Sequence, residues 1–128
     1  MRILIDTHVL IWALSDPSRL SAQVHRDLSD SRNVILFSAA SIWEIAIKAA
    51  LRRSVFTIDP DELLDEAISI GFQELPISSR VAARVKDILM IHQDPFDRIL
   101  VAQAMAEPAV LLTADSKLQA YSDLVRLV

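Results

Sequence analysis

The 128-residue chain contains no cysteine and only one glycine, Gly71. Without cysteine it has no disulfide, no thiolate nucleophile and no cysteine zinc site, and such a composition suits a reducing compartment. Phosphate-binding loops and dinucleotide-binding motifs need several glycines, because the backbone must approach a phosphate group closely. The sequence therefore excludes both, and any chemistry on phosphate has to use metal ions or basic side chains.

Long apolar runs are also missing, although hydrophobic residues make up 52% of the chain and its mean hydropathy is +0.35. The longest run, residues 9–14, is far below the roughly 18 to 20 residues that a membrane span needs. Asp6 and His8 interrupt the apolar N-terminal segment, and no small-residue cleavage site follows, so we expect no signal peptide and a cytoplasmic protein. The length predicts one domain, residues 1–128, and the apolar composition indicates that part of its surface meets a partner.

A basic excess is lacking as well, since 13 basic residues stand against 17 acidic ones and the net charge is -4. Nucleic-acid-binding proteins usually carry a basic surface patch. This absence is weak evidence against nucleic-acid binding, because bound metal cations reverse the local field of an acidic site.

Strand-like and helix-like segments alternate along the chain. We predict strands at residues 2–5, 33–37, 72–75, 109–113 and 124–128, and helices at residues 8–14, 21–29, 39–53, 61–70, 78–91 and 95–107, with a short helix from residue 115. Near-continuous apolar strands that alternate with helices are typical of an α/β fold, in which helices cover both faces of a parallel sheet.

Four acidic residues stand in segments that leave the carboxyl ends of predicted strands: Asp6, Glu44, Asp97 and Asp115. Ligands of open α/β sheets bind outside these strand ends, so the four acids can converge. Converging carboxylates repel one another unless a cation lies among them. Oxygen ligands without cysteine or paired histidines favour Mg²⁺ or Mn²⁺, ions that activate water and bind the oxygens of a phosphodiester.

Each acid also has a purely structural interpretation. Asp6 could cap the helix that follows it. Glu44 shares a polar helix face with Ser41, Lys48 and Arg52. An exposed pair with Lys48, four residues further on, is the simpler interpretation from spacing alone.

The other acids have structural interpretations as well. Asp94 precedes Pro95, the arrangement of an N-cap followed by proline at the first helical position, so we favour capping for Asp94 and at most a supporting part at the site. Asp97 then falls in the first turn, where an acid suits the helix dipole. Asp115 could cap the last short helix. No acid is decisive alone, and the hypothesis rests on their joint placement.

Four stretches together resemble a known family: IDTHVLIWAL at the start, SAASIWEIAIK around Glu44, DPFDRILVAQA around Asp97 and LLTAD ending at Asp115. In this order and spacing they resemble the PIN-domain ribonucleases, specifically the VapC-type toxins of bacterial VapBC toxin-antitoxin pairs. The resemblance extends over essentially the whole chain. The loop AEPAV departs from the family because it lacks a glycine often found there, and we expect only a local change.

The resemblance implies a Rossmann-like parallel sheet and metal-dependent endonucleolytic cleavage of RNA. It implies that Asp6, Glu44, Asp97 and Asp115 form the family's acidic tetrad, which holds Mg²⁺ or Mn²⁺. On this basis we expect Asp6 and Asp97 to be the most direct metal ligands, while Glu44 and Asp115 complete the site and orient the attacking water. The family also implies a homodimer and a small antitoxin that neutralises the toxin.

Other side chains are candidates for supporting roles. Thr7 and Thr113 could hydrogen-bond the acids, or be ordinary hydroxyls at strand ends. Trp12 and Trp43 are expected in the core or at an interface, and the three histidines show no triad spacing, so we expect them to be structural or exposed. The basic residues that could contact RNA phosphates, or simply face solvent, are Lys48, Arg52, Arg53 and Arg98.

Two other classes of function remain open at this stage. A phosphoacceptor receiver domain has a similar length and an acidic pocket, and Asp59 after VFTI resembles its acceptor. That class also needs a second acid beside Asp6, where Thr7 stands, and a lysine at the end of a late strand, which the stretch AVLLTAD lacks. The non-enzymatic alternative is a protein-binding subunit whose acids are helix caps, and metal-induced stabilisation would distinguish it from a nuclease.

Overall fold

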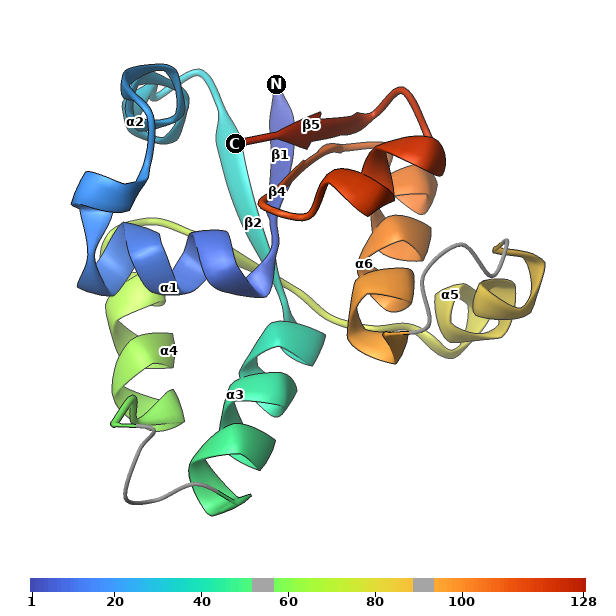
Figure 1. Cartoon of the computed structure of the whole chain (residues 1–128), viewed down its shortest axis with the longest axis horizontal. Coiled ribbons are helices and arrows are strands. Elements are labelled where there is room, and N and C mark those ends of the chain that lie inside the picture. Colours follow the sequence, from blue (N-terminus) through green and yellow to red (C-terminus); the bar gives the residue numbers. More distant parts are fainter. Residues whose placement is uncertain (52–56, 89–93) are drawn as a thin grey trace.

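A parallel sheet forms the centre of the computed structural model, which describes residues 1–51, 57–88 and 94–128 and contains five strands within them (Figure 1). The strands are β1 (Arg2–Ile5), β2 (Val34–Ser38), β3 (Gln73–Leu75), β4 (Val110–Thr113) and β5 (Val125–Leu127). They lie in the order β3-β2-β1-β4-β5, and all four pairings are parallel. The predicted α/β fold is confirmed, with β1 at the centre between β2 and β4.

The helices are α1 (Thr7–Ser15), α2 (Ala22–Ser29), α3 (Ala39–Leu51), α4 (Pro60–Ser69), α5 (Ser79–Arg84) and α6 (Pro95–Ala106), with 3-10 turns at Pro17–Arg19, Val85–Asp87 and Ser116–Ala120. At the start of each α-helix, a side-chain oxygen accepts a hydrogen bond from a backbone N–H of the first turn. In chain order, the residues that supply this oxygen are Asp6, Ser21, Ser38, Asp59, Ser78 and Asp94. Gly71 follows α4 with φ 97°, a conformation that favours glycine.

Two apolar cores lie on opposite faces of the sheet. Ile3 and Ile5 of β1 belong to the core that contacts α1, α2 and α4, whereas Leu4 belongs to the core that contacts α6. In Figure 1, α1, α2 and α4 accordingly lie on one side of the strands and α6 on the other. This arrangement buries β1 on both faces from Ile3 to Ile5 and explains the apolar run at these positions.

The predicted helix over residues 78–91 was wrong in its length. Helix α5 ends at Arg84, a 3-10 turn follows, and Ile88 has an extended backbone (φ -78°, ψ 126°). The Nη2 atom of Arg98 donates to the carbonyl oxygens of Val85 (3.1 Å) and Ile88 (2.8 Å), which a continuous helix would use internally. The end of this predicted helix, residues 89–91, lies outside the described residues.

The end of another predicted helix, with Arg52 and Arg53, also falls outside the described residues. The short helix predicted from Asp115 is present as a 3-10 turn. None of the described helices has the length and apolarity required to cross a lipid bilayer.

Candidate functional site

Buried polar side chains gather where the strands end at their carboxyl termini. The described residues of this kind are Asp6, Thr7, Ser38, Ser41, Glu44, Gln103 and Thr113. Apart from Gln103 of α6, all lie at the ends of β1, β2 or β4 or in the first two turns of the helix that follows. Burying polar groups costs free energy unless they are hydrogen-bonded, so such a cluster indicates a functional site.

Asp6 is 3% exposed and accepts hydrogen bonds on both carboxylate oxygens. Its Oδ1 accepts from the N–H of Val9 (2.8 Å), and its Oδ2 accepts from the Thr113 hydroxyl (2.6 Å) and the N–H of Ala114 (3.2 Å). Burial raises the pKa of Asp6 above its ordinary value, although these hydrogen bonds and the nearby His8 oppose the effect. A bound cation would favour the carboxylate form of this residue.

Glu44 is held by groups from two helices. The Thr7 hydroxyl donates to its Oε1 at 2.7 Å, and Nζ of Lys48 lies 3.1 Å from its Oε2. The Thr7 hydroxyl also lies 2.9 Å from the Ser41 hydroxyl. Glu44 is only 9% exposed and Ser41 is fully buried. The pairing with Lys48 is therefore confirmed, whereas the interpretation of this helix face as solvated was wrong.

Thr113 connects Asp6 with Asp115. Its hydroxyl donates to Asp6 and accepts a hydrogen bond from the backbone N–H of Asp115 at 3.0 Å. The Asp115 Oδ1 atom accepts from the N–H of Lys117 at 2.9 Å, so Asp115 also caps the 3-10 turn that follows β4. The hydrogen bonds expected of Thr7 and Thr113 are thus both present.

Asp97 is half-buried in the first turn of α6. The N-terminal end of α6 lies beside α3. The ring of Phe96 there meets the ring of Trp43 on α3 edge to face, with 5.2 Å between their centroids. Helix α3 also carries Glu44, so the packing of α3 against α6 brings the segment that holds Asp97 to the same edge of the sheet.

Asp94 caps α6 as predicted, since its Oδ1 accepts from the N–H of Phe96 at 2.9 Å. We expect Asp94→Asn to lower the free energy of unfolding by about 1 kcal/mol or less, because asparagine caps nearly as well as aspartate. Urea denaturation in EDTA measures this change. Asp94→Ala, which removes the cap, is the control and should cost more. A loss of Mn²⁺ binding in Asp94→Asn with stability retained would instead assign Asp94 to the metal site.

The Thr113 hydroxyl thus bonds the Asp6 carboxylate and the backbone of Asp115, while Thr7, the residue after Asp6 in the chain, bonds Glu44. Asp97 lies on the adjoining helix α6. Within the described part of the chain, no three His, Asp or Glu side chains are placed as a ready-made metal cage. Mg²⁺ is nevertheless usually bound by one or two carboxylates, with waters and substrate phosphates as its other ligands. The donor set, which consists of carboxylate oxygens, fits that mode of binding.

Several other expectations change with the structure. Arg98 is half-buried and its guanidinium donates to the carbonyl oxygens of Val85 and Ile88, which favours neither of the two alternatives given for it, contact with RNA phosphate or exposure to solvent. Asp59 is an exposed N-cap that accepts from the N–H of Asp61, so the receiver-domain interpretation was wrong. His8 and His25 are exposed, as expected, while His92 lies outside the described residues.

Both tryptophans approach other rings or charges. Trp43 is 62% exposed, which excludes it from the core. Trp12 is half-buried, with the guanidinium of Arg19 4.9 Å from its ring centroid.

Three residues of the buried polar cluster were not predicted as site residues: Ser38, Ser41 and Gln103. Ser38 was expected only as a helix cap, and Ser41 only on a polar helix face. Gln103 interrupts the apolar stretch ILVAQAMA of α6, and this lone amide among core residues was the signal that could have identified it.

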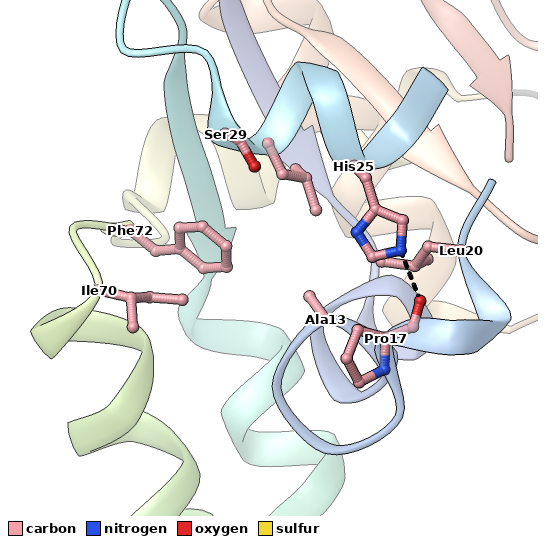
Figure 2. Close-up of a pocket in the computed structure, with 8 residues that line it drawn as sticks. Ala13, Pro17, Leu20, His25, Ser29, Ile70 and Phe72 are labelled. Carbon is pink, nitrogen blue, oxygen red and sulfur yellow. Dashed lines mark hydrogen bonds between the residues drawn. The ribbon is translucent and has the colours of Figure 1, made fainter. Parts of the chain in front are cut away.

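A separate pocket of about 350 Å³ lies between α1, α2 and the end of α4 (Figure 2). Ile70 and Phe72 face His25 and Ser29 across it, and Nε2 of His25 lies 2.7 Å from the carbonyl oxygen of Pro17. None of the four predicted acids lines this pocket. The predicted metal site at the carboxyl edge of the sheet therefore does not include this pocket.

Comparison with known proteins identifies the family. Residues 3–124 match the family model of the PIN domain, whereas no curated protein sequence matches the chain. Fifteen chains of solved structures are similar, and one of them belongs to the crystal structure of VapBC2 from Rickettsia felis bound to a DNA fragment from their promoter. That similarity has a TM-score of 0.73 and covers 100% of this chain and 98% of the other at 18% identity, which supports the fold. Because the family model spans nearly the whole chain, the chain belongs to the PIN-domain family of nucleases.

Proposed function

We propose that this nuclease is a metal-dependent endoribonuclease and the toxin of a toxin-antitoxin pair. The observation that carries the proposal is the burial of Asp6 and Glu44 at the carboxyl edge of the sheet, where the neighbouring Thr113 and Thr7 bond them and where Asp115 and the helix that bears Asp97 also begin. The sequence motifs around all four acids resemble those of VapC-type toxins. Such a toxin acts on cellular RNA, so we place it in the cytoplasm.

The four acids would bind Mg²⁺ or Mn²⁺, with Asp6 and Asp97 as the most direct ligands and Glu44 and Asp115 in support. When bound, the ion supplies Lewis acidity at the RNA phosphate and activates a water molecule. Thr7 and Thr113 keep the carboxylates of Glu44 and Asp6 oriented through short hydrogen bonds. The burial of Asp6 excludes water from one side of the site and strengthens electrostatic interactions there.

Cleavage of total cellular RNA in the presence of Mg²⁺, Mn²⁺ or EDTA tests this function. Cleavage with either ion and none with EDTA supports it, whereas no cleavage under any condition supports the protein-binding alternative. Asp97→Asn is a better inactive control than Asp6→Ala, because Asp6 accepts three hydrogen bonds and caps α1. Loss of activity in Asp6→Ala would therefore combine a catalytic and a structural defect.

We further propose that the toxin forms a homodimer and binds a small antitoxin. An apolar groove of about 280 Å³ is lined by Ala40, Trp43, Ile77, Ala82, Pro95, Phe96 and Ile99. Exposed tryptophan in an apolar groove is typical of protein interfaces. We assign this groove to the second copy of the chain, because α3 and α6 both present apolar side chains there beside the acidic site.

Trp43→Ala should weaken the dimer by about 30-fold or more, because truncating a central interface tryptophan costs about 2 kcal/mol. Sedimentation equilibrium measures the dimer dissociation constant. Leu51→Ala is the matched control, since Leu51 is also an exposed apolar residue of α3 but does not line the groove. A monomeric wild type, or equal dissociation constants for Trp43→Ala and the wild type, would reject this interface.

A further inference from the structure

Gln103 is a buried polar residue of α6 to which the proposed reaction assigns no role. It is 2% exposed, and its neighbours in the helix, Val101, Ala102 and Ala104, are buried apolar residues. A buried amide costs free energy unless its donors and acceptor are satisfied. The hydrogen-bond partners of the Gln103 amide therefore indicate which parts of the fold this residue holds together.

These partners come from two strand ends. Oε1 of Gln103 accepts a hydrogen bond from the Ser38 hydroxyl at 2.6 Å. Its Nε2 atom lies 3.3 Å from the carbonyl oxygen of Leu75 and 3.5 Å from that of Pro76. Gln103 thus joins α6 to the carboxyl ends of β2 and β3.

Ser38 extends this connection into the acidic site. Its hydroxyl also accepts from the N–H of Ala40 at 3.0 Å, which fixes the start of α3. The first two turns of α3 then carry Ser41 and Glu44, and both contact Thr7. Two groups of hydrogen bonds, one from Gln103 through Ser38 to Ala40 and one from Ser41 and Glu44 to Thr7, are therefore joined by the first turns of α3.

We propose that Gln103 is a positioning residue that fixes α6, and with it Asp97, relative to Glu44 on α3. Apolar contacts between helices are non-directional, whereas hydrogen bonds have preferred distances and angles. We call the hydrogen bonds of Gln103 to Ser38 and to the carbonyl of Leu75 the Gln103 bridge. This bridge fixes how α6 is rotated about its axis and how closely it lies against the ends of β2 and β3. Apolar packing alone would specify both less closely. Metal sites depend on ligand placement within about 0.5 Å, so this bridge controls metal affinity. The inference rests on the proposed metal-dependent function.

The test compares Mn²⁺ binding to Gln103→Met and to the wild type by isothermal titration calorimetry, well below the melting temperature of each protein. Methionine keeps the length of the side chain and removes both polar ends. We expect Mn²⁺ affinity to fall by about 10- to 100-fold, the usual effect of removing a group that orients metal ligands. Val101→Ala is the control, because it also weakens the core of α6 but touches no part of the bridge.

A merely structural role predicts that both variants melt at lower temperature and bind Mn²⁺ like the wild type. Ser38→Ala removes the same hydrogen bond from its other side and also the cap of α3, so it should weaken Mn²⁺ binding at least as much as Gln103→Met. Unchanged affinity in Gln103→Met, whatever Ser38→Ala does, or an equal loss in Val101→Ala, would overturn this inference and leave the proposed function standing. A wild type that binds no Mn²⁺ would reject the proposed function as well.

Discussion

Asp97→Asn should reduce RNA cleavage by about 10²- to 10³-fold while leaving the metal-free free energy of unfolding unchanged or slightly higher. Loss of a direct metal ligand removes several kcal/mol of transition-state stabilisation, at about 1.4 kcal/mol per tenfold in rate. Asparagine has the same size, and removing one negative charge lowers repulsion within the acidic cluster. Single-turnover cleavage of a labelled RNA with Mn²⁺, together with urea denaturation in EDTA, measures both quantities.

The matched control is Asp61→Asn, which makes the same chemical change at an exposed acid in the first turn of α4. It should leave the cleavage rate unchanged, because Asp61 belongs to no part of the acidic cluster. A substantial loss of metal-free stability in Asp97→Asn would assign Asp97 to stabilising the start of α6. Full activity in that variant would remove Asp97 from the metal site.

Most of the fold follows from local sequence signals. Some signals act within a few residues and are therefore visible in the sequence. They are the apolar run of β1, the Asp-Pro pairs at the start of α4 and α6, and Gly71 after α4. The early end of α5 follows instead from the contacts of Arg98 with Val85 and Ile88. A contact that depends on tertiary packing leaves no periodic signal in the segment that it changes.

At the predicted acidic site, too, tertiary contacts could not be predicted from the sequence. The sequence presented capping and membership of the metal site as alternatives for Asp6. The structure confirms the cap, and because the two oxygens of this side chain bond different partners, capping does not exclude the proposed role at the metal site. Oδ1 caps α1, while Oδ2 bonds Thr113 of β4. A strand end that is also a helix start supplies both kinds of partner at once.

Glu44 illustrates why burial was not predictable from the sequence. The Thr7 hydroxyl that binds its carboxylate is 37 positions away in the chain, and the periodicity of α3 alone indicates a polar face. The burial of Glu44 therefore depends on how α1 and α3 meet at the sheet edge.

Addition of Mn²⁺ at a hundredfold excess over its dissociation constant should raise the melting temperature at pH 7 by on the order of 10 °C, and EDTA should reverse the shift. A ligand selective for the folded state contributes about 2.7 kcal/mol at that excess, which corresponds to a shift of this size for a chain of 128 residues. Differential scanning calorimetry measures it. An unchanged melting temperature would favour a scaffold whose acids are only caps.

The effect of Mn²⁺ should also grow with pH, because Asp6 binds a proton more tightly in the folded than in the unfolded state. Burial raises the pKa of Asp6 in the folded protein. Its contribution to metal-free stability is therefore present at low pH and is lost as the pH rises through the folded-state pKa. Mn²⁺ needs the deprotonated carboxylate, so the metal-induced shift should increase over that same range. A shift that is constant with pH would mean that Mn²⁺ binds without Asp6.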